Sequence, residues 1–418
     1  MADPVEVHIS LPNGTHRVGT LYRAPSRDRE TVSFEYHEGW LGNDERFALE
    51  PALAVGKGRF YPDQEREMFG AIGDSAPDTW GRQLMRRRER RRAEAEGRPV
   101  RTLHETDFLL GVADISRLGA LRLRREGEEE FQAPNEAGVP GFMMLGRLLE
   151  SADRIERGEE TDEDLQMIFA PGSSLGGARP KASVKDNQGR LAIAKFPKET
   201  DEYSVEAWEH IALTLANEAG IKCPDHDLVQ VGGRSVLLSW RFDREGDGRI
   251  PFLSALSMLQ LKDGDRSSYP EIMDELARIG AGVKSDAPEL FRRMAFNILI
   301  SNVDDHLRNH GFLFRGKKGW ALSPVYDLNP TPQDLKPRVL TTNISPDDGT
   351  CSVGLAIEQA EYFGLKADQA AKIISEIGEA VSHWREVASR AGQTKAQIDR
   401  MQSAFEHEDL TRARALSS

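Results

Sequence analysis

Several polar residues lie close together in one short stretch of this 418-residue chain, "FNILISNVDDHLRNHGFLF" from Phe296 to Phe314. Within it, Asp304 and Asn309 are five positions apart, the separation between the base aspartate and the metal-binding asparagine in the catalytic loop of protein kinases. Phosphoryl transfer needs such a pair, because a carboxylate must orient the attacking hydroxyl and accept its proton while hard oxygen ligands hold Mg2+. The stretch therefore predicts a catalytic loop with Asp304 as the base.

Two features around this loop refine the prediction. Counting back from Asn309 selects Asp304, whereas the adjacent Asp305 would leave a separation of only four, so we expect Asp305 to be a cap or a surface acid. A hairpin, "GFLF-RGKKG-WALS", follows the loop, and "PVYDLNP" then places Asp327 eighteen residues beyond Asn309 (327 − 309). Because kinases show the same order of catalytic loop, hairpin and second aspartate, we predict that Asn309 and Asp327 bind Mg2+.

A glycine-rich stretch, "PGSSLGGARPKASVKDNQGRLAIAKFPK", precedes these residues in the chain. Gly176 and Gly177 allow the backbone to approach a ligand closely and to point N–H groups at phosphate oxygens. The following strand pair ends at Lys195, which is placed like the strand lysine that holds nucleotide phosphates in kinases. The next helical pattern, "SVEAWEHIALTLANEAG", carries Glu206 and Glu209 one turn apart, and either is placed to orient Lys195.

Hydrophobic periodicity indicates the elements that would position these residues. "VEVHISL", "HRVGTLYR" and "TVSFEYH" alternate at period two and predict a small antiparallel sheet, and "RSVLLSWRF" predicts a later strand that leads into a mostly helical remainder. The fold class indicated is α+β, with a small β-rich N-terminal domain followed by a bilobal protein-kinase-like fold. The predicted boundaries are residues 1–125 for the first domain, 126–245 for the lobe with the nucleotide loop and 246–418 for the mostly α-helical C-terminal lobe.

Composition excludes several classes of function. The chain is 39% hydrophobic, and we find neither a signal-peptide segment nor about 18 uninterrupted apolar residues, so a cytoplasmic protein is expected. Two cysteines without metal-type spacing argue against disulfides and zinc. A net charge of -13 opposes broad attraction to nucleic acid or membranes, although the basic segment Met85–Arg101 is either a salt-bridged helix surface or a contact for nucleic acid or an acidic partner.

The motifs, taken in order, resemble those of the HipA-type toxin serine/threonine kinases of bacterial toxin–antitoxin systems. The resemblance spans nearly the whole chain and lies in "GDSAPDTWGR", "SSLGGARPK", "AIAKFPK", "SWRFDR", "NVDDHLRN" and "PVYDLNP". It implies ATP and Mg2+ as cofactors, Asp304 as catalytic base, and Asn309 and Asp327 as metal ligands. The residues it implies at the nucleotide are Gly176, Gly177, Ala178, Arg179, Pro180, Lys181, Lys195, His306 and Asn309, with Trp240, Arg241 and Phe242 as the hinge beside adenine.

The same resemblance implies partners and regulation. A HipB-like helix-turn-helix antitoxin would bind the chain and carry it to operator DNA, and an aminoacyl-tRNA synthetase would be the protein substrate. Autophosphorylation would fall on Ser174, with Ser173 as the alternative, and would switch the enzyme off. Two other interpretations stay open, a small-molecule kinase and an antitoxin-bound co-repressor with a vestigial site. The intact set of Lys195, Asp304, Asn309 and Asp327 favours an active enzyme over the second of these.

Overall fold

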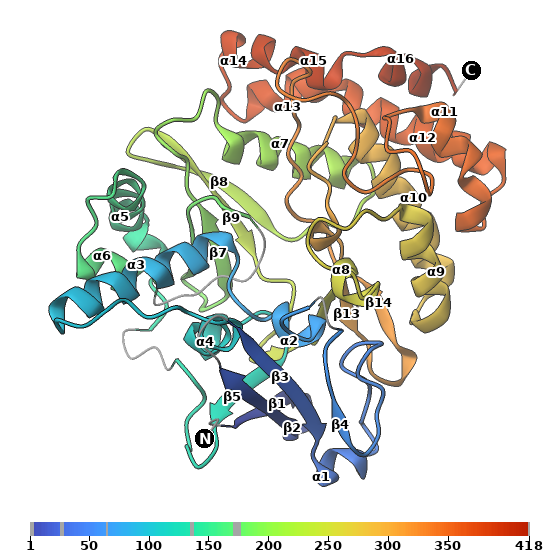
Figure 1. Ribbon diagram of the computed structural model, residues 1–418. Coiled ribbons are helices and arrows are strands. Elements are labelled where there is room, and N and C mark those ends of the chain that lie inside the picture. The colour runs from blue at the N-terminus through green and yellow to red at the C-terminus, as the bar shows by residue number, and fades with distance from the viewer. Residues whose placement is uncertain (1–3, 26–28, 64–65, 134–137, 170–176, 417–418) are drawn as a thin grey trace. The chain divides into compact units, whose positions relative to one another are not determined.

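The computed structural model describes residues 4–25, 29–63, 66–133, 138–169 and 177–416. The chain divides into two compact units, which are considered separately below (Figure 1). The first unit contains Met1–Thr200 and Val229–Lys262, and the second contains Asp201–Leu228 and Asp263–Ser418. The larger sheets belong to the first unit and most long helices to the second, so the predicted α+β fold class is confirmed.

The first sheet opens the chain and has five strands in the order β4-β3-β2-β1-β5. Its strands are β1 (Val5–Leu11), β2 (Gly14–Pro25), β3 (Glu30–Tyr36), β4 (Arg59–Phe60) and β5 (Leu121–Arg125). Period-two alternation predicted the first three, and the apolar side chains of Val5, Val7 and Ile9 are fully buried. Strand β5 comes from far along the chain and pairs antiparallel with β1, with Val7 opposite Leu123.

The second sheet of this unit has four strands in the order β6-β7-β9-β8. Its strands are β6 (Lys181–Lys185), β7 (Leu191–Lys195), β8 (His226–Val231) and β9 (Arg234–Trp240). The predicted hairpin of β6 and β7 is confirmed, and its register places Lys181 opposite Lys195. Short elements complete the unit: α1 (Glu38–Leu41), α2 (Gly70–Gly73), α4 (Glu105–Gly111), η1 (Asp114–Ser116), η2 (Phe142–Met144), β10 (Arg244–Glu245), β11 (Gly248–Arg249), β12 (Phe252–Ser254) and α8 (Ala255–Met258).

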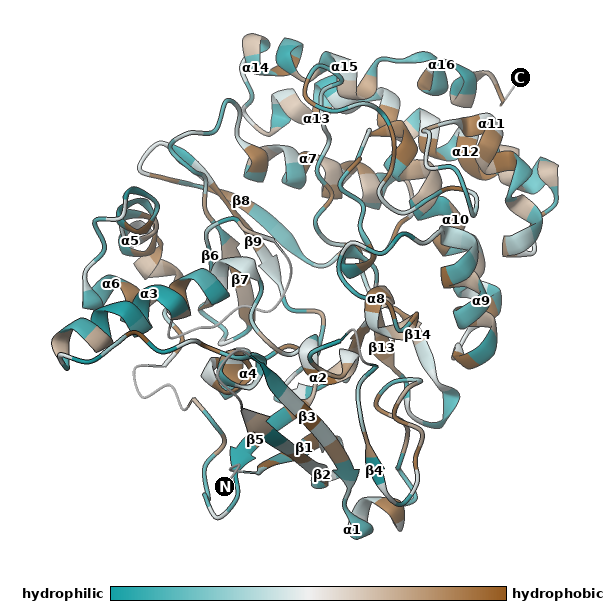
Figure 2. Ribbon diagram, viewed as in Figure 1, coloured by the Kyte–Doolittle hydropathy of each residue, from teal (hydrophilic) through white to brown (hydrophobic). Residues whose placement is uncertain are grey.

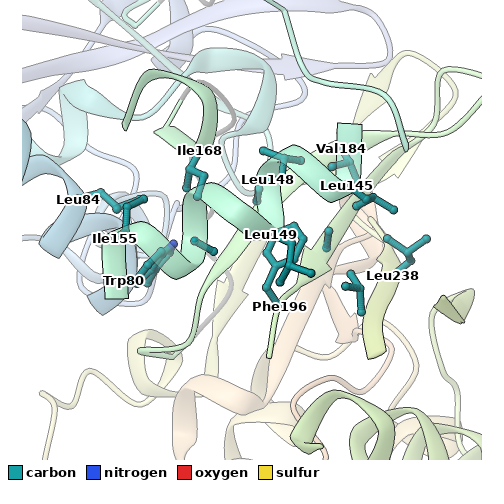
Figure 3. Close-up of a cluster of buried hydrophobic side chains, with 14 of the residues drawn as sticks. Trp80, Leu84, Leu145, Leu148, Leu149, Ile155, Ile168, Val184, Phe196 and Leu238 are labelled. Atoms are coloured by element: carbon teal, nitrogen blue, oxygen red, sulfur yellow. The ribbon is translucent and has the colours of Figure 1, made fainter. Parts of the chain in front are cut away.

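One hydrophobic core joins this sheet to three helices, α3 (Thr79–Ala95), α5 (Leu145–Arg157) and α6 (Asp162–Phe169). Figure 3 shows Trp80 and Leu84 of α3 in the same cluster as side chains of α5, α6 and the sheet, among them Leu148, Ile168, Val184, Phe196 and Leu238. Because Trp80 belongs to the first predicted domain and the sheet to the second, this core crosses the predicted boundary. Residues 125 and 245 both fall inside the first unit.

A buried ionic network ties the same two predicted domains together. Asp243 is fully buried and accepts hydrogen bonds from the backbone N–H of Gly119 (2.6 Å), from Arg241 (2.6 Å) and from Arg244 (2.7 Å). Burial by itself would raise the pKa of Asp243, but the charges of Arg241 and Arg244 outweigh it and lower that pKa to about 2. The "SWRFDR" motif is therefore attached to the segment that precedes β5.

The basic segment Met85–Arg101 lies mostly on α3, which Figure 2 shows as largely hydrophilic. Its arginines are largely paired with acidic side chains: Arg87 with Glu160 (2.8 Å), Arg91 with Asp162 (2.6 Å), Arg92 with Glu96 (2.6 Å) and Arg98 with Glu89 (2.6 Å). Cations held in this way attract phosphates less than free ones do. The structure favours a salt-bridged helix surface over a contact for nucleic acid.

The second unit is built around α10 (Val283–Leu299), whose apolar residues are buried and which packs against α9, α12 and the hairpin strand β14. Its other helices are α7 (Val205–Glu218), α9 (Tyr269–Ile279), α11 (Val353–Glu358), η5 (Ala360–Phe363), α12 (Ala367–Ser382), α13 (Trp384–Arg390), α14 (Lys395–Arg400), α15 (Gln402–Phe405) and α16 (Glu408–Ala415). The predicted hairpin is confirmed as β13 (Gly311–Phe314) and β14 (Trp320–Leu322), joined through η4 (Gly316–Lys318). Among all described helices, none is both long enough and apolar enough for a membrane crossing.

Candidate active site

The catalytic loop begins where α10 ends. Ser301 has a positive φ of +53°, so the chain turns sharply away from the helix axis there. The side-chain Nδ2 of Asn309, on η3 (Leu307–Asn309), donates to the backbone carbonyl of Asp304 at 3.1 Å, and the backbone N–H of His306 donates to the same carbonyl at 2.9 Å. The two residues whose spacing of five predicted a kinase loop thus lie in one turn, and the side chain of Asn309 contacts the backbone of Asp304.

The two adjacent acids of this loop have opposite environments. The Asp304 side chain is 59% exposed, whereas Asp305 is only 1% exposed as a residue. The carboxylate of Asp305 lies 2.8 Å from Nε2 of His310 and accepts a hydrogen bond from the hydroxyl of Tyr269. The prediction that Asp305 is a cap or a surface acid was wrong, because tertiary contacts bury it. Only Asp304 is open to a protein hydroxyl, which supports its assignment as the base.

The contacts of Asp305 extend into a chain of buried hydrogen bonds. The hydroxyl of Tyr269 accepts from Nδ2 of Asn297 (2.9 Å), and Oδ1 of Asn297 accepts from Nδ2 of Asn302 (3.1 Å). Oδ1 of Asn302 in turn accepts from the backbone N–H of Asn329 at 3.1 Å. Burial, and then the charge of Asp305, raises the pKa of Tyr269 well above its usual value, so its hydroxyl stays a donor. This network connects the catalytic loop to the segment that contains Asp327.

A second contact brings the two predicted metal ligands together. The hydroxyl of Tyr326 donates to the backbone carbonyl of Arg308 at 2.7 Å. These residues immediately precede Asp327 and Asn309, so the hydrogen bond links the two segments that carry the predicted ligands. Asp327 has a positive φ of +55°, a conformation that aspartate and asparagine adopt more readily than most residues and that often marks functional sites.

The donor set at this point suits Mg2+. The Nδ2 of Asn309 donates to the carbonyl of Asp304. The Oδ1 of Asn309 is buried and has no hydrogen-bond partner among the residues that the structure describes. A buried acceptor without a partner is costly, and a hard cation would satisfy it. Together with the predicted Asp327 carboxylate, Asn309 Oδ1 would supply oxygen ligands of the kind that Mg2+ prefers.

The helix glutamates predicted beside Lys195 lie in the second unit. Glu206 and Glu209 are both buried on α7, which begins with Ser204 as its N-cap. Glu209 accepts a hydrogen bond from the backbone N–H of Asp327 at 3.1 Å. One glutamate of the predicted pair therefore supports the segment that contains the predicted metal ligand Asp327. The pairing of either glutamate with Lys195, a residue of the first unit, stays a prediction.

The described end of the glycine-rich loop is fixed by the motif "GDSAPDTWGR". Lys181 is buried and forms an ion pair with Asp78 at 2.8 Å, while Asp78 also caps α3 through the backbone N–H of Gly81 (2.8 Å). The backbone N–H of Trp80 donates to the carbonyl of Gly177 at 3.4 Å, where φ is +94°. The sequence did not predict this role of Asp78, although an aspartate directly before a helical pattern signals an N-cap.

Some predicted loop residues cannot be placed. Ser173, Ser174 and Gly176 lie outside the described residues. Of the others, Ala178 is exposed, Arg179 is partly buried, and the carbonyl of Pro180 accepts from the backbone N–H of Phe196 at 2.9 Å. Lys195 is partly exposed at the end of β7, and His306 has a buried Nδ1 with no hydrogen-bond partner within the described part of the chain. Their predicted contacts with nucleotide stay predictions.

The side chains of the predicted hinge, residues 240–242, contact other residues of the first unit. Trp240 donates from Nε1 to Asp186 at 2.9 Å, in the turn between β6 and β7. Arg241 is buried in its ion pair with Asp243, so its side chain supports the strand end. Phe242 is partly buried with its ring 6.3 Å from that of Phe252. The side chains of Trp240 and Arg241 are therefore engaged within the protein, and contact of this segment with a nucleotide base stays a prediction.

The contrast between the adjacent acids gives a stability test. Asp305→Ala should lower the free energy of unfolding by about 3 kcal/mol or more, because it leaves buried partners at His310 and Tyr269 without their carboxylate. Asp304→Ala is the matched control and should change it by less than about 1 kcal/mol, because the Asp304 side chain is exposed and its ion pair with Lys336 at 3.5 Å is exposed as well. Urea denaturation of both variants measures the difference. Equal midpoints would contradict the buried role of Asp305.

Known proteins resemble this chain over most of its length. The family model of the HipA-like C-terminal domain matches residues 173–384, just over half of the chain. A Sinorhizobium fredii protein named "Putative kinase Y4mE" is 24% identical over 344 residues, with 74% of each chain covered. A Haemophilus influenzae protein named "Putative kinase" is 23% identical over 223 residues, which are 46% of this chain and 64%, less than two thirds, of that protein.

A solved structure shows the same fold. It is the HipA chain of Shewanella oneidensis, described as a toxin–antitoxin system complex of HipA, HipB and operator DNA, and it matches with a TM-score of 0.67 at 17% identity. The match covers 99% of this chain and 96% of that one, so the fold is shared from end to end. Because the family model also covers more than half of the chain, this protein belongs to the HipA-like family that its motifs predicted.

Proposed function

We propose that this protein is an ATP- and Mg2+-dependent serine/threonine protein kinase and the toxin of a HipBA-like toxin–antitoxin module. The observation that carries the proposal is an exposed Asp304 whose carbonyl is bound by Asn309, beside a buried Asp305 that anchors the loop. An exposed carboxylate on an anchored loop is what a base for a protein hydroxyl requires, because the acceptor must reach it and its position must not vary.

Each residue of the site would have a separate role in the reaction. Asp304 accepts the proton of the acceptor hydroxyl and orients its oxygen toward the transferred phosphorus. Asn309 and Asp327 would hold Mg2+, which, when bound, offsets the negative charge of the transferred phosphoryl group. Glu209 keeps the Asp327 segment in place through its backbone N–H. In the first unit, Lys195 and the backbone of the loop that ends at Lys181 would bind the nucleotide phosphates.

The proposed partners follow from the family. The Shewanella protein with the same fold is described in complex with HipB and operator DNA, which supports a HipB-like antitoxin as partner and DNA binding mainly through that antitoxin. An aminoacyl-tRNA synthetase is the proposed substrate, and its phosphorylation would inhibit translation and growth. The pairing of the α3 arginines with acidic residues is consistent with an indirect attachment to DNA.

Transfer of labelled phosphate into whole-cell extract tests the function. The protein is incubated with extract, Mg2+ and ATP labelled at the γ-phosphate, and polypeptides are then separated from small molecules. One labelled polypeptide, identified by mass spectrometry, is the expected result. Label confined to the small-molecule fraction would instead identify a small-molecule kinase. If folded protein transfers no label at all, the proposal fails in favour of a co-repressor with a vestigial site.

Autophosphorylation is proposed at Ser174, with Ser173 as the alternative. A phosphate there would add a charge of about −1.5 to −2 where ATP phosphates would bind, and the repulsion would switch the enzyme off. Intact mass after incubation with Mg-ATP should increase by one phosphate, and fragmentation should place it on one of these serines. The single variants Ser174→Ala and Ser173→Ala decide between them. No phosphate on either serine, in a preparation that phosphorylates its substrate, would contradict the proposed switch.

A further inference from the structure

The segment that follows Asp327, residues 332–340, is firmly attached to the second unit. Gln333 donates to the backbone carbonyl of Ser403 at 2.9 Å, and its own N–H donates to the hydroxyl of Ser403 at 3.1 Å. Arg338 donates to the backbone carbonyl of Ile298 at 2.8 Å and pairs with Asp409 at 2.7 Å. Several side chains of the segment thus fix it against α10, α15 and α16.

Apart from Pro332 and Leu340, the remaining residues of the segment are exposed. Leu335 and Val339 are each 45% exposed, which is unusual for apolar residues in a well-anchored segment. Lys336 lies between them in the sequence, and its Nζ is 3.5 Å from Oδ1 of Asp304. Single exposed apolar residues need no explanation, but here two of them flank a lysine that reaches the proposed catalytic base.

We propose that Leu335, Lys336 and Val339 form the docking surface for the polypeptide that is phosphorylated. The inference rests on the proposed function, because it takes Asp304 as the base that meets the acceptor hydroxyl. Lys336 places the surface beside Asp304, where the acceptor hydroxyl would have to lie. Exposed apolar side chains on both sides of Lys336 in the sequence suit the residues that flank a hydroxyl in a polypeptide, which a small hydroxyl compound lacks.

The chemistry of the surface defines the acceptor. Leu335 and Val339 would bury an apolar side chain close to the acceptor serine or threonine, because removing apolar surface from water is favourable. Lys336 would repel a basic residue next to the hydroxyl. The acceptor is therefore a polypeptide with an apolar residue near its phosphorylated hydroxyl.

A peptide library tests this surface. Each peptide carries one central serine or threonine and one fixed residue at a flanking position, and phosphate transfer from ATP is measured for the parent and for the double variant Leu335→Ser/Val339→Ser. We expect the parent to prefer an apolar residue at one flanking position by about fivefold or more. The double variant should lose this preference, with its KM for the preferred peptide raised about tenfold, which equals about 1.4 kcal/mol.

The control is Tyr362→Ser, which removes another exposed large side chain of the second unit, 53% exposed on η5. This variant should keep the parental preference, and the melting temperatures of all variants are compared to verify folding. Unchanged selectivity in the double variant, or no flanking preference in an active parent, overturns the docking surface and leaves the kinase proposal standing. If the parent phosphorylates neither peptides nor extract proteins, the proposed function fails and the docking surface fails with it.

Discussion

Asp304→Asn is expected to lower the initial rate of substrate phosphorylation by about 10²- to 10⁴-fold, the contribution that a general base usually makes. The amide has nearly the shape of the carboxylate, but it cannot accept the proton of the acceptor hydroxyl. The fold should survive, because the side chain is exposed and the backbone carbonyl that binds Asn309 is unchanged. Initial rates with labelled ATP, at equal concentrations of folded protein, measure the effect.

The control for this variant is Asp347→Asn, an exposed aspartate of the same unit. It should retain the parental rate within about threefold, because removing one exposed surface charge changes little. An Asp304→Asn enzyme that also stays within threefold of the parent would refute the assignment of Asp304. Activity would then have to depend on another acid of the second unit, and Asp305 is excluded from direct contact with a protein hydroxyl by its burial.

Asp327→Asn is expected to remove both turnover and the stabilisation of the protein by Mg-ATP. Asparagine is chosen because it tolerates the positive φ of this position, so the change acts on the ligand and adds little backbone strain. A ligand that binds only the folded state raises the melting temperature by mass action, so losing the metal site should reduce that shift. The loss of an outer-shell metal partner lowers activity by about 10- to 100-fold, and the loss of a direct ligand should lower turnover by more than that.

Asp304→Asn serves as the matched control for this second experiment. It keeps Asn309 and Asp327, so its melting shift with Mg-ATP should equal that of the parent although its turnover has collapsed. The two variants would thus separate chemistry from metal binding. A parental melting shift in Asp327→Asn would show that Asp327 does not hold the metal.

The parts of the site that could be predicted are those encoded locally. The five-residue separation of Asp304 and Asn309 is a property of one turn, and the structure shows the hydrogen bond that closes it. The hairpin after the loop and the strand that ends at Lys195 follow from period-two patterns and turn residues, which need no knowledge of distant contacts. These local signals also identified the family, because their order along the chain is specific.

The parts that could not be predicted depend on contacts between distant segments. The local spacing from Asn309 selected Asp304 as the base, but no local signal showed that Asp305 is buried. That burial depends on Tyr269, 36 residues earlier in the chain, whose hydroxyl donates to Asp305. Lys181 has the same limitation, because its partner Asp78 is far away in the sequence. The predicted boundary at residue 125 followed a change in composition, whereas the real core includes Trp80 on one side of it and Leu148 on the other.

The pairing of Asp78 with Lys181 has a consequence for anyone who wishes to express residues 126–418 alone. A shortened chain that begins at residue 126 would lack Asp78, Trp80 and Leu84, so Lys181 would lose its partner and part of the core would be exposed to water. Such a fragment should be prone to aggregation, and its glycine-rich loop would have lost its support. In evolutionary terms, the segment from Asp78 to Leu84 is then no accessory that can be exchanged freely, because Lys181 and the core beside it depend on this segment.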